Sequence, residues 1–166
     1  MNNKAYFNIG ARHISISTVG VIDGIKELAN QSLQINLAIS LHAPSDNLRV
    51  KIIPANKKYP INKIIDDINY YLNKTNRRIM IEYIMIKDFN DSNENACQLI
   101  KLLKKITRPL YFVNLIFYNS ATEFKPSDPT QIKRFREILL NQKIETTLRY
   151  RFGQDIKAAC GQLADA

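Results

Sequence analysis

Short apolar runs alternate along the chain with segments of helical periodicity. The apolar runs predict buried strands, and the segments between them carry apolar residues three and four positions apart, as amphipathic helices do. The expected strands cover residues 14–18, 36–42, 78–86, 110–118 and 144–151. The expected main helices cover residues 21–31, 61–74 and 129–143, with a further helix between Ser92 and Pro109.

Local signals indicate where several of these helices begin and end. Asp46 is expected to cap a short helix that ends near Pro54, and Ser92 to cap the helix after the third strand. Pro109 ends that helix, and Pro129 lies in the first turn of the last one.

The order of elements predicts an α/β fold. Strand and helix alternate four times before a lone final strand, which is typical of a parallel sheet with right-handed crossovers. The strands are apolar with little alternation, so we expect both of their faces to be buried. Glycine-rich phosphate-binding patterns are absent from the sequence, which argues against a dinucleotide fold. Four units cannot close an eight-stranded barrel, so we expect an open arc whose first strand has an unpaired edge.

Small polar residues follow the predicted strands at the points where the strands end. Because the carboxyl ends of parallel strands meet at one edge of a sheet, where such folds bind ligands, these residues predict a small-molecule site. The candidates are Ser17 and Thr18, Ser40 and His42, Lys87 and Asp88, and Asn119 and Ser120.

Charge and cysteine content indicate which partner and which cellular compartment to expect. The 166 residues carry a net charge of +9, which suits a polyanionic partner such as RNA. The two cysteines form no disulfide framework, and no apolar run is long enough to span a membrane, so we expect a cytoplasmic protein of one domain. Cys97 is expected to pack beside the apolar stripe of its helix. With His13, His42 and Cys160 it offers no close ligand pair, so no metal site is predicted.

Five stretches of the sequence, in order, resemble the C-terminal half of a family of radical S-adenosylmethionine methyltransferases. These enzymes methylate adenine C2 in 23S ribosomal RNA and, in some members, transfer RNA. A sister group that methylates adenine C8 shares most of the motifs and stays an alternative. The stretches are NIGARHISISTVG (8–20), NLAISLHAPSDNLR (36–49), IMIEYIMIKDFND (79–91), VNLIFYN (113–119) and GQDIKAACGQLA (153–164).

The resemblance implies a fold and a set of site residues. The fold is a partial (β/α)6 barrel, of which residues 1–166 would hold the last four strand–helix units, a terminal strand and a tail with the catalytic cysteine. The N-terminal strands and the cluster-binding loop would be missing. Residues that contact S-adenosylmethionine in the family fall on Ser17, Ser40, Leu41, His42 and Asn119. The methyl-carrying cysteine falls on Cys160, within small neighbours that leave its sulfur approachable.

The resemblance also implies a mechanism. A thiolate readily attacks a sulfonium methyl group, whereas adenine C2 is too electron-poor to do so. In the family, the cysteine takes a methyl group from one S-adenosylmethionine. A second molecule is cleaved at a [4Fe-4S] cluster, and the resulting radical activates the S-methyl group for addition to adenine. A second cysteine then releases the product by forming a disulfide.

The sequence lacks the cluster motif C-x3-C-x2-C and the second, resolving cysteine of the family. The chain by itself is therefore expected to be unable to generate the radical, and a separately supplied N-terminal half is one expected partner. Two alternatives stay open: a non-catalytic, basic RNA-binding remnant, and a fragment that aggregates through its open edge. Glu82 lies inside a predicted strand and is expected to be a buried partner of another group, without a catalytic role.

Overall fold

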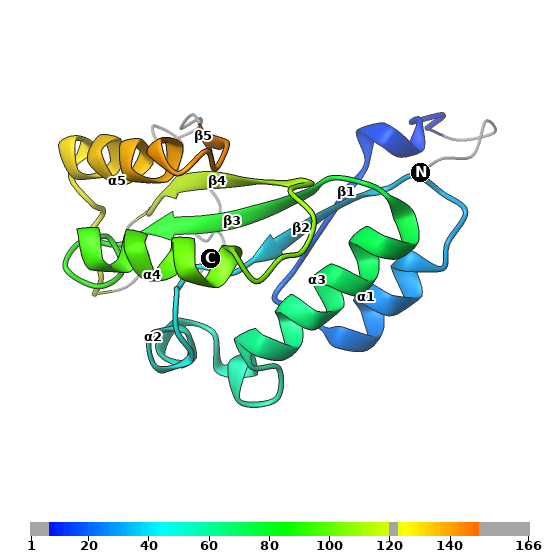
Figure 1. Ribbon diagram of the computed structural model, residues 1–166, viewed down its shortest axis with the longest axis horizontal. Helices are drawn as coiled ribbons and strands as arrows, with labels where there is room; N and C mark the ends of the chain where they lie inside the picture. Colours follow the sequence, from blue (N-terminus) through cyan, green and yellow to red (C-terminus); the bar gives the residue numbers. More distant parts are fainter. Residues whose placement is uncertain (1–6, 120–122, 150–166) are drawn as a thin grey trace.

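The computed structural model describes residues 7–119 and 123–149 and shows an open, curved, parallel sheet of five strands (Figure 1). The strands follow chain order, from β1 at one edge to β5 at the other, and all neighbours are parallel. They are β1 (Ser15–Thr18), β2 (Asn36–Ser40), β3 (Ile79–Met85), β4 (Tyr111–Phe117) and β5 (Thr146–Leu148). The predicted α/β fold and its parallel order are therefore confirmed.

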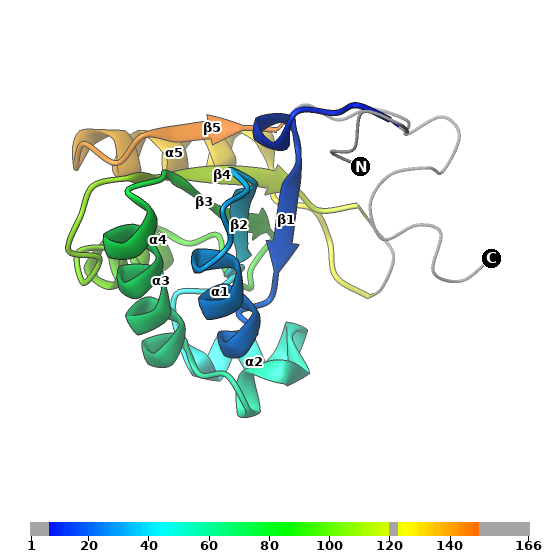
Figure 2. The same ribbon diagram turned by 90° about the vertical axis from the view of Figure 1, so that its right-hand side faces the viewer.

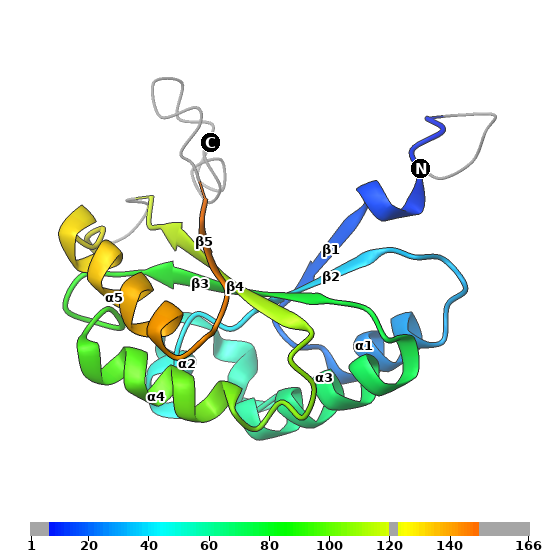
Figure 3. The ribbon, with the colours of Figure 1, turned by 45° about the horizontal axis from the view of Figure 1, so that its top comes forward.

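Helices connect successive strands and lie along one face of the sheet (Figure 3). The principal helices are α1 (Ile22–Ala29), α2 (Asp46–Ile52), α3 (Ile61–Thr75), α4 (Asn93–Leu103) and α5 (Pro129–Asn141). Short 3-10 helices cover Ala11–His13 and Pro54–Lys57. In Figure 2, α1 and α3 lie side by side on the same side of the sheet. Over the described residues, the opposite, concave face of the sheet carries no helix.

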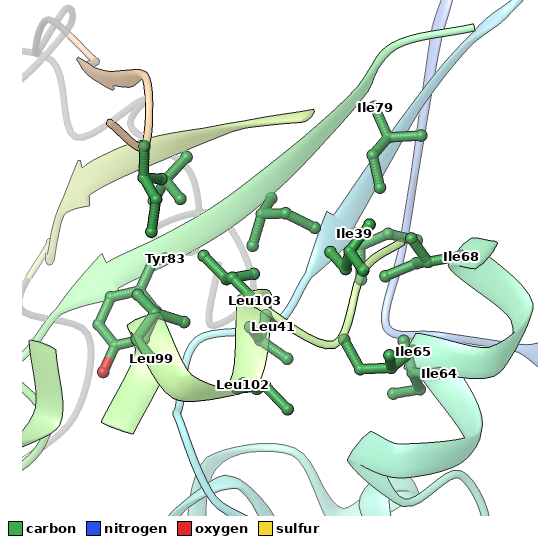
Figure 4. Close-up of a cluster of buried hydrophobic side chains, with 14 of the residues drawn as sticks. Ile39, Leu41, Ile64, Ile65, Ile68, Ile79, Tyr83, Leu99, Leu102 and Leu103 are labelled. Carbon is green, nitrogen blue, oxygen red and sulfur yellow. The ribbon is translucent and has the colours of Figure 1, made fainter. Parts of the chain in front are cut away.

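The hydrophobic core lies between the sheet and these helices (Figure 4). Every second residue of β3 is buried in it, and the residues between are only half-buried because they face the side without helices. The expectation that the strands are buried on both faces is thus wrong for the described part of the chain: β1 is largely exposed. The side chains that meet in Figure 4 include Ile39, Leu41, Ile64, Ile65, Ile68, Ile79, Tyr83, Leu99, Leu102 and Leu103.

Of the two predicted helix caps, one is confirmed and one is wrong. Ser92 caps α4 as expected: its hydroxyl accepts from the Asn95 amide at 3.1 Å, and the Asn95 side chain accepts from the Ser92 amide. The prediction for Asp46 is wrong, because Ser45 is the N-cap residue of α2 and Asp46 is its first residue. The Asp46 carboxylate instead accepts from the Ile61 amide at 2.9 Å and so satisfies the first N–H group of α3.

Cys97 is exposed, so the prediction that it packs against the core is wrong. The buried positions of α4 include Ala96, Leu99, Ile100 and Leu103, and Cys97 lies outside the stripe that they form. The sequence placed the helix correctly but the angular position of this residue incorrectly. Among the described residues, no helix is long and apolar enough to cross a membrane.

Candidate functional site

A row of polar side chains crosses the helix-free face of the sheet. The strand register pairs Ser40 of β2 with Glu82 of β3, Glu82 with Asn114 of β4, and Asn114 with Thr147 of β5. Paired residues of neighbouring strands point to the same face, so one polar group from each of four strands falls on one line. The Asn114 side-chain oxygen accepts from the Thr147 hydroxyl at 2.9 Å, which joins the far end of the row.

Ser17 of β1 joins this row through its side chain, although the strand register pairs it with Ala38. Its hydroxyl donates to the Glu82 carboxylate at 2.7 Å, and Ser40 donates to the same oxygen, Oε2, at 3.3 Å. The two serine oxygens are 3.1 Å apart. Three strands therefore bring three oxygen atoms together on the open face, and we call Ser17, Ser40 and Glu82 the serine–glutamate cluster.

Apolar side chains flank this row on the same face. The pairing of Ala38 with Met80 and of Met80 with Phe112 gives one apolar row, toward the amino ends of the strands. The pairing of Ile84 with Ile116 gives another, toward the carboxyl ends. A narrow polar line between apolar rows suits a ligand that has both a hydrophobic ring and a few hydroxyl or amino groups.

His42 forms the turn that follows β2. Its backbone is left-handed, with φ of 60°, and its carbonyl accepts from the side-chain Nδ2 of the buried Asn90 at 2.8 Å. The imidazole Nδ1 accepts from the Ile84 amide at 3.2 Å, so the ring continues the β2–β3 ladder beyond the last strand residue. Burial lowers the pKa of His42 to about 4, with the charge of Glu82 opposing this shift and that of Arg49 adding to it. The ring is therefore neutral at neutral pH, and its Nε2 carries the proton.

Arg49 of α2 fixes the ends of the first two strands from inside the protein. Its guanidinium is fully buried and donates to the carbonyls of Val19 at 2.7 Å and Ser40 at 3.0 Å. It also donates to the Leu41 carbonyl at 2.9 Å and to the Asn56 side chain at 2.8 Å. Burial lowers the pKa of Arg49 to about 10, against the opposing charge of Asp46, so the group stays charged at neutral pH. This one side chain therefore holds the ends of β1 and β2, next to Ser17 and His42, in place.

The structure brings together some of the residues predicted from strand ends. Ser17, Ser40 and His42 surround the carboxyl end of β2, and Glu82 contacts both serines. Asn119 follows β4 and is half-buried. Thr18 is engaged elsewhere: its hydroxyl accepts from the amides of Gly20 and Val21, in the turn that leads to α1.

Other predicted residues lie away from the serine–glutamate cluster or outside the described part. The Lys87 ammonium lies 2.9 Å from the Asp128 carboxylate, and Asp88 is an exposed residue of the same loop. The Leu41 side chain belongs to the core, its amide donates to the Glu82 carbonyl, and its carbonyl accepts from Arg49. Ser120 and Cys160 lie outside the described residues, so their expected roles stay predictions.

Sequence reasoning missed three residues of this site and the ligand role of a fourth. Glu82 received no ligand role, and Asn90, Arg49 and Asn114 received no role. A signal for two of them was present, because Glu82 and Asn114 are the only residues in β3 and β4, respectively, that are neither aliphatic nor aromatic. The burial of Arg49 and Asn90 had no comparable signal, because loops and short helices usually expose such residues.

The residues of this chain do not fit an iron–sulfur cluster. The described part contains no group of three His, Cys, Asp or Glu side chains that could hold a metal. The whole sequence contains two cysteines, and Cys97 lies exposed on α4. Thiolates are the usual cluster ligands, and two are too few to bind a [4Fe-4S] cluster in the ordinary way.

Comparison with known proteins finds related sequences over nearly the whole chain. A probable dual-specificity RNA methyltransferase RlmN of Spiroplasma citri is 47% identical over 98% of the chain. A protein of the same name from Dictyoglomus turgidum is 50% identical over 95%. The chain spans 46% and 45% of these two proteins, or about half the length of the curated relatives. A search against protein-family models gives no match.

Solved structures share the fold. A radical SAM methyltransferase from Sphaerobacter thermophilus has a TM-score of 0.91 and 42% identity, covering 97% of this chain and 47% of that one. A domain of a pyruvate-formate lyase-activating enzyme from Bacteroides vulgatus has a TM-score of 0.64 at 13% identity and shares the fold alone. The curved sheet described above therefore matches part of a radical SAM methyltransferase.

Proposed function

From the relation of this chain to the C-terminal part of the radical SAM RNA methyltransferases, we propose that it supplies the S-adenosylmethionine site and the methyl-carrying cysteine of such an enzyme. Residues 1–166 would form one partial-barrel domain. The observation that carries the proposal is the polar row on the open face, with Ser17, Ser40 and Glu82 in mutual contact.

The chemistry of the row fits S-adenosylmethionine. The molecule has an apolar adenine, a ribose with two hydroxyl groups, and a sulfonium centre that supplies a methyl group. The serine–glutamate cluster would hold the ribose, and the apolar rows around Met80 and Ile84 would contact the adenine. The His42 ring, neutral at neutral pH, would add no cationic charge beside the sulfonium. Asn119 and the Leu41 backbone complete the proposed ligand contacts.

Cys160 is the proposed methyl carrier. Its thiolate would attack the methyl group and displace the sulfonium sulfur, so that an S-methyl bond forms as the C–S⁺ bond breaks. Cys97 is exposed on α4, one of the helices that cover one face of the sheet (Figure 3), and takes no part in the proposal. Because residues 1–166 do not fit a cluster, they perform none of the cluster-dependent steps. Those steps would depend on a part homologous to the other half of the relatives.

The proposed substrate is an adenine of 23S ribosomal RNA, and of transfer RNA, modified at C2 in the cytoplasm. The adenine-C8 branch is the alternative target. The net charge of +9 supports an RNA partner in either case. The same charge favours a second candidate function, an RNA-binding module without catalysis, which would bind RNA in a salt-dependent way and would not bind S-adenosylmethionine.

Reconstitution tests this proposal. The purified chain is mixed with the N-terminal half of the Spiroplasma citri relative, its cluster assembled, together with S-adenosylmethionine, a reductant and 23S ribosomal RNA. We expect methylated adenosine, identified as the C2 or C8 isomer by chromatography against both standards. Cys160→Ala should abolish the product, and the matched control Cys97→Ala should retain it. No product from a mixture in which the full-length relative is active, or full activity of Cys160→Ala, would contradict the proposal.

A further inference from the structure

The serine–glutamate cluster uses all of its own hydroxyl protons internally. Ser17 donates to Glu82 Oε2 at 2.7 Å. The Ser40 hydroxyl has two acceptors within reach, Glu82 Oε2 at 3.3 Å and Ser17 Oγ at 3.1 Å. A serine hydroxyl has one proton, and an ionised carboxylate has none. In either arrangement of the Ser40 proton, the cluster offers only lone pairs to a ligand on the open face.

We propose that Glu82 is a specificity-determining residue, which orients Ser17 and Ser40 as acceptors and thereby selects a ligand with two adjacent hydroxyl donors. This inference rests on the proposed function and names the part of S-adenosylmethionine that the cluster recognises, its ribose diol. The second carboxylate oxygen of Glu82 and the outward lone pairs of the serines are the acceptors for those two hydroxyls.

The donor and acceptor count also says which groups the cluster rejects. Phosphate and carboxylate groups bring acceptors and negative charge, and both are repelled by a carboxylate that has no proton to offer. A ribose that lacks one hydroxyl leaves a cluster acceptor without its donor, and such a mismatch at a site built for a hydroxyl is costly. Glu82 is central because it lies on β3, between Ser40 of β2 and Asn114 of β4.

Replacing the carboxylate with an amide reverses part of this pattern. In Glu82→Gln the side chain keeps nearly the same size but gains two N–H donors. The amide can donate to a serine oxygen, which releases a serine proton toward the ligand. The variant therefore places donors where ribose hydroxyls also need to donate.

Calorimetric titration of the reconstituted complex tests this inference. The probes are S-adenosylhomocysteine, its 2′-deoxy and 3′-deoxy forms, and 5′-methylthioadenosine, which has the same ribose and adenine but lacks the α-amino and carboxylate groups. Removing either hydroxyl should weaken binding to the unaltered complex by about 10- to 100-fold. Glu82→Gln should weaken binding of S-adenosylhomocysteine by a similar factor and reduce the deoxy penalty to less than about threefold.

Three further variants separate recognition from simple structural damage. Glu137→Gln removes an exposed carboxylate of α5 and should leave all affinities unchanged. Glu82→Asp keeps the charge and should retain a deoxy penalty. Ser17→Ala removes one acceptor from an exposed position on β1, where folding is least at risk, and should reduce the penalty for one hydroxyl only.

The possible outcomes distinguish failure of this inference from failure of the proposed function. A deoxy penalty that is unchanged in both Glu82→Gln and Ser17→Ala would overturn this inference and leave the proposed function standing. The inference also fails if the Glu82→Gln effect disappears with 5′-methylthioadenosine, because the Glu82 carboxylate would then bind the α-amino group of S-adenosylhomocysteine and not its ribose. No binding of S-adenosylhomocysteine by the unaltered complex would overturn the proposed function, and this inference with it.

Discussion

At the scale of a single residue, His42 belongs both to the fold and to the proposed site. Its left-handed backbone turns the chain away from β2, and its ring accepts a hydrogen bond from the Ile84 amide. That acceptor role requires a neutral ring. The same burial that fixes the imidazole therefore makes its protonation unfavourable in the folded protein.

Stability should depend on pH through this ring. The pKa of His42 falls from 6.5 to about 4 on folding, so between these values the unfolded chain binds a proton that the folded chain does not. The His42 contribution is complete above about pH 6.5 and is lost as the pH falls toward 4, by at most about 3 kcal/mol. Urea unfolding from pH 7 to pH 4 measures it.

His42→Asn is the test variant, because asparagine tolerates the left-handed backbone and offers a side-chain oxygen to the Ile84 amide. We expect a shallower loss of stability with falling pH than in the unaltered protein. His13→Asn removes an exposed imidazole and is the matched control, with an unaltered slope. Equal slopes for all three proteins would show that His42 does not carry this dependence.

At the scale of elements, the turn between β1 and α1 is a tight junction near the site. Gly20 has φ of 93°, a conformation that other residues rarely adopt. A Cβ atom there would lie 2.5 Å from Ile64 Cδ1 and 2.7 Å from Ile64 Cγ1. Ile64 is fully buried in α3 and has little room to move, so this glycine sets how closely the turn after β1 approaches α3.

Two glycines that are four residues apart should respond in opposite directions to alanine. Gly20→Ala combines backbone strain with a clash, and should lower the free energy of unfolding by about 2–4 kcal/mol. Gly24→Ala adds a methyl group to α1 where the nearest atom, Val21 Cγ1, is 3.8 Å away. The gain in helix propensity should raise the free energy of unfolding by about 0.5–1 kcal/mol. Urea unfolding of both variants measures these changes. A Gly20→Ala variant with an unchanged free energy of unfolding would contradict this account of the turn.

At the scale of the whole molecule, the described part of the sheet has β1 at its edge. Within the described residues, no strand pairs with the outer edge of β1, and an apolar groove of about 420 Å³ lies between β1 and α1. Ile16 of β1 is 42% exposed and Leu33 is 46% exposed, and both line this groove. An open edge beside an apolar groove is suited to a further parallel strand and its helix.

Hydrogen exchange should report the pairing of this edge. Adding the N-terminal half of the Spiroplasma citri relative should slow exchange of amides in residues 15–18 by about tenfold or more, because a strand that pairs with β1 protects them. Ile16→Lys should reduce this protection. Leu140→Lys changes an exposed apolar residue of α5 and should not. Unchanged exchange at β1 in a mixture that makes product would show that the other half binds elsewhere.

The sequence by itself determined the order and type of the elements. Apolar runs and helical periodicity are local properties, so the strands, the helices and the parallel order could be predicted, along with the Ser92 cap. Local patterns also placed Ser17, Ser40 and His42 at the ends of strands, because strand ends can be recognised without knowing which strands are neighbours.

Only the tertiary structure decided which face of the sheet is open and which residues meet on it. Glu82 and Asn114 looked alike in sequence as polar interruptions of apolar strands, and the register alone placed them in one row with Ser40. Asp46 and Arg49 have partners that lie 15 and 30 residues away, at the start of α3 and the end of β1. Such contacts depend on how strands and helices pack, which no local pattern encodes, and they are the contacts that assemble the proposed site.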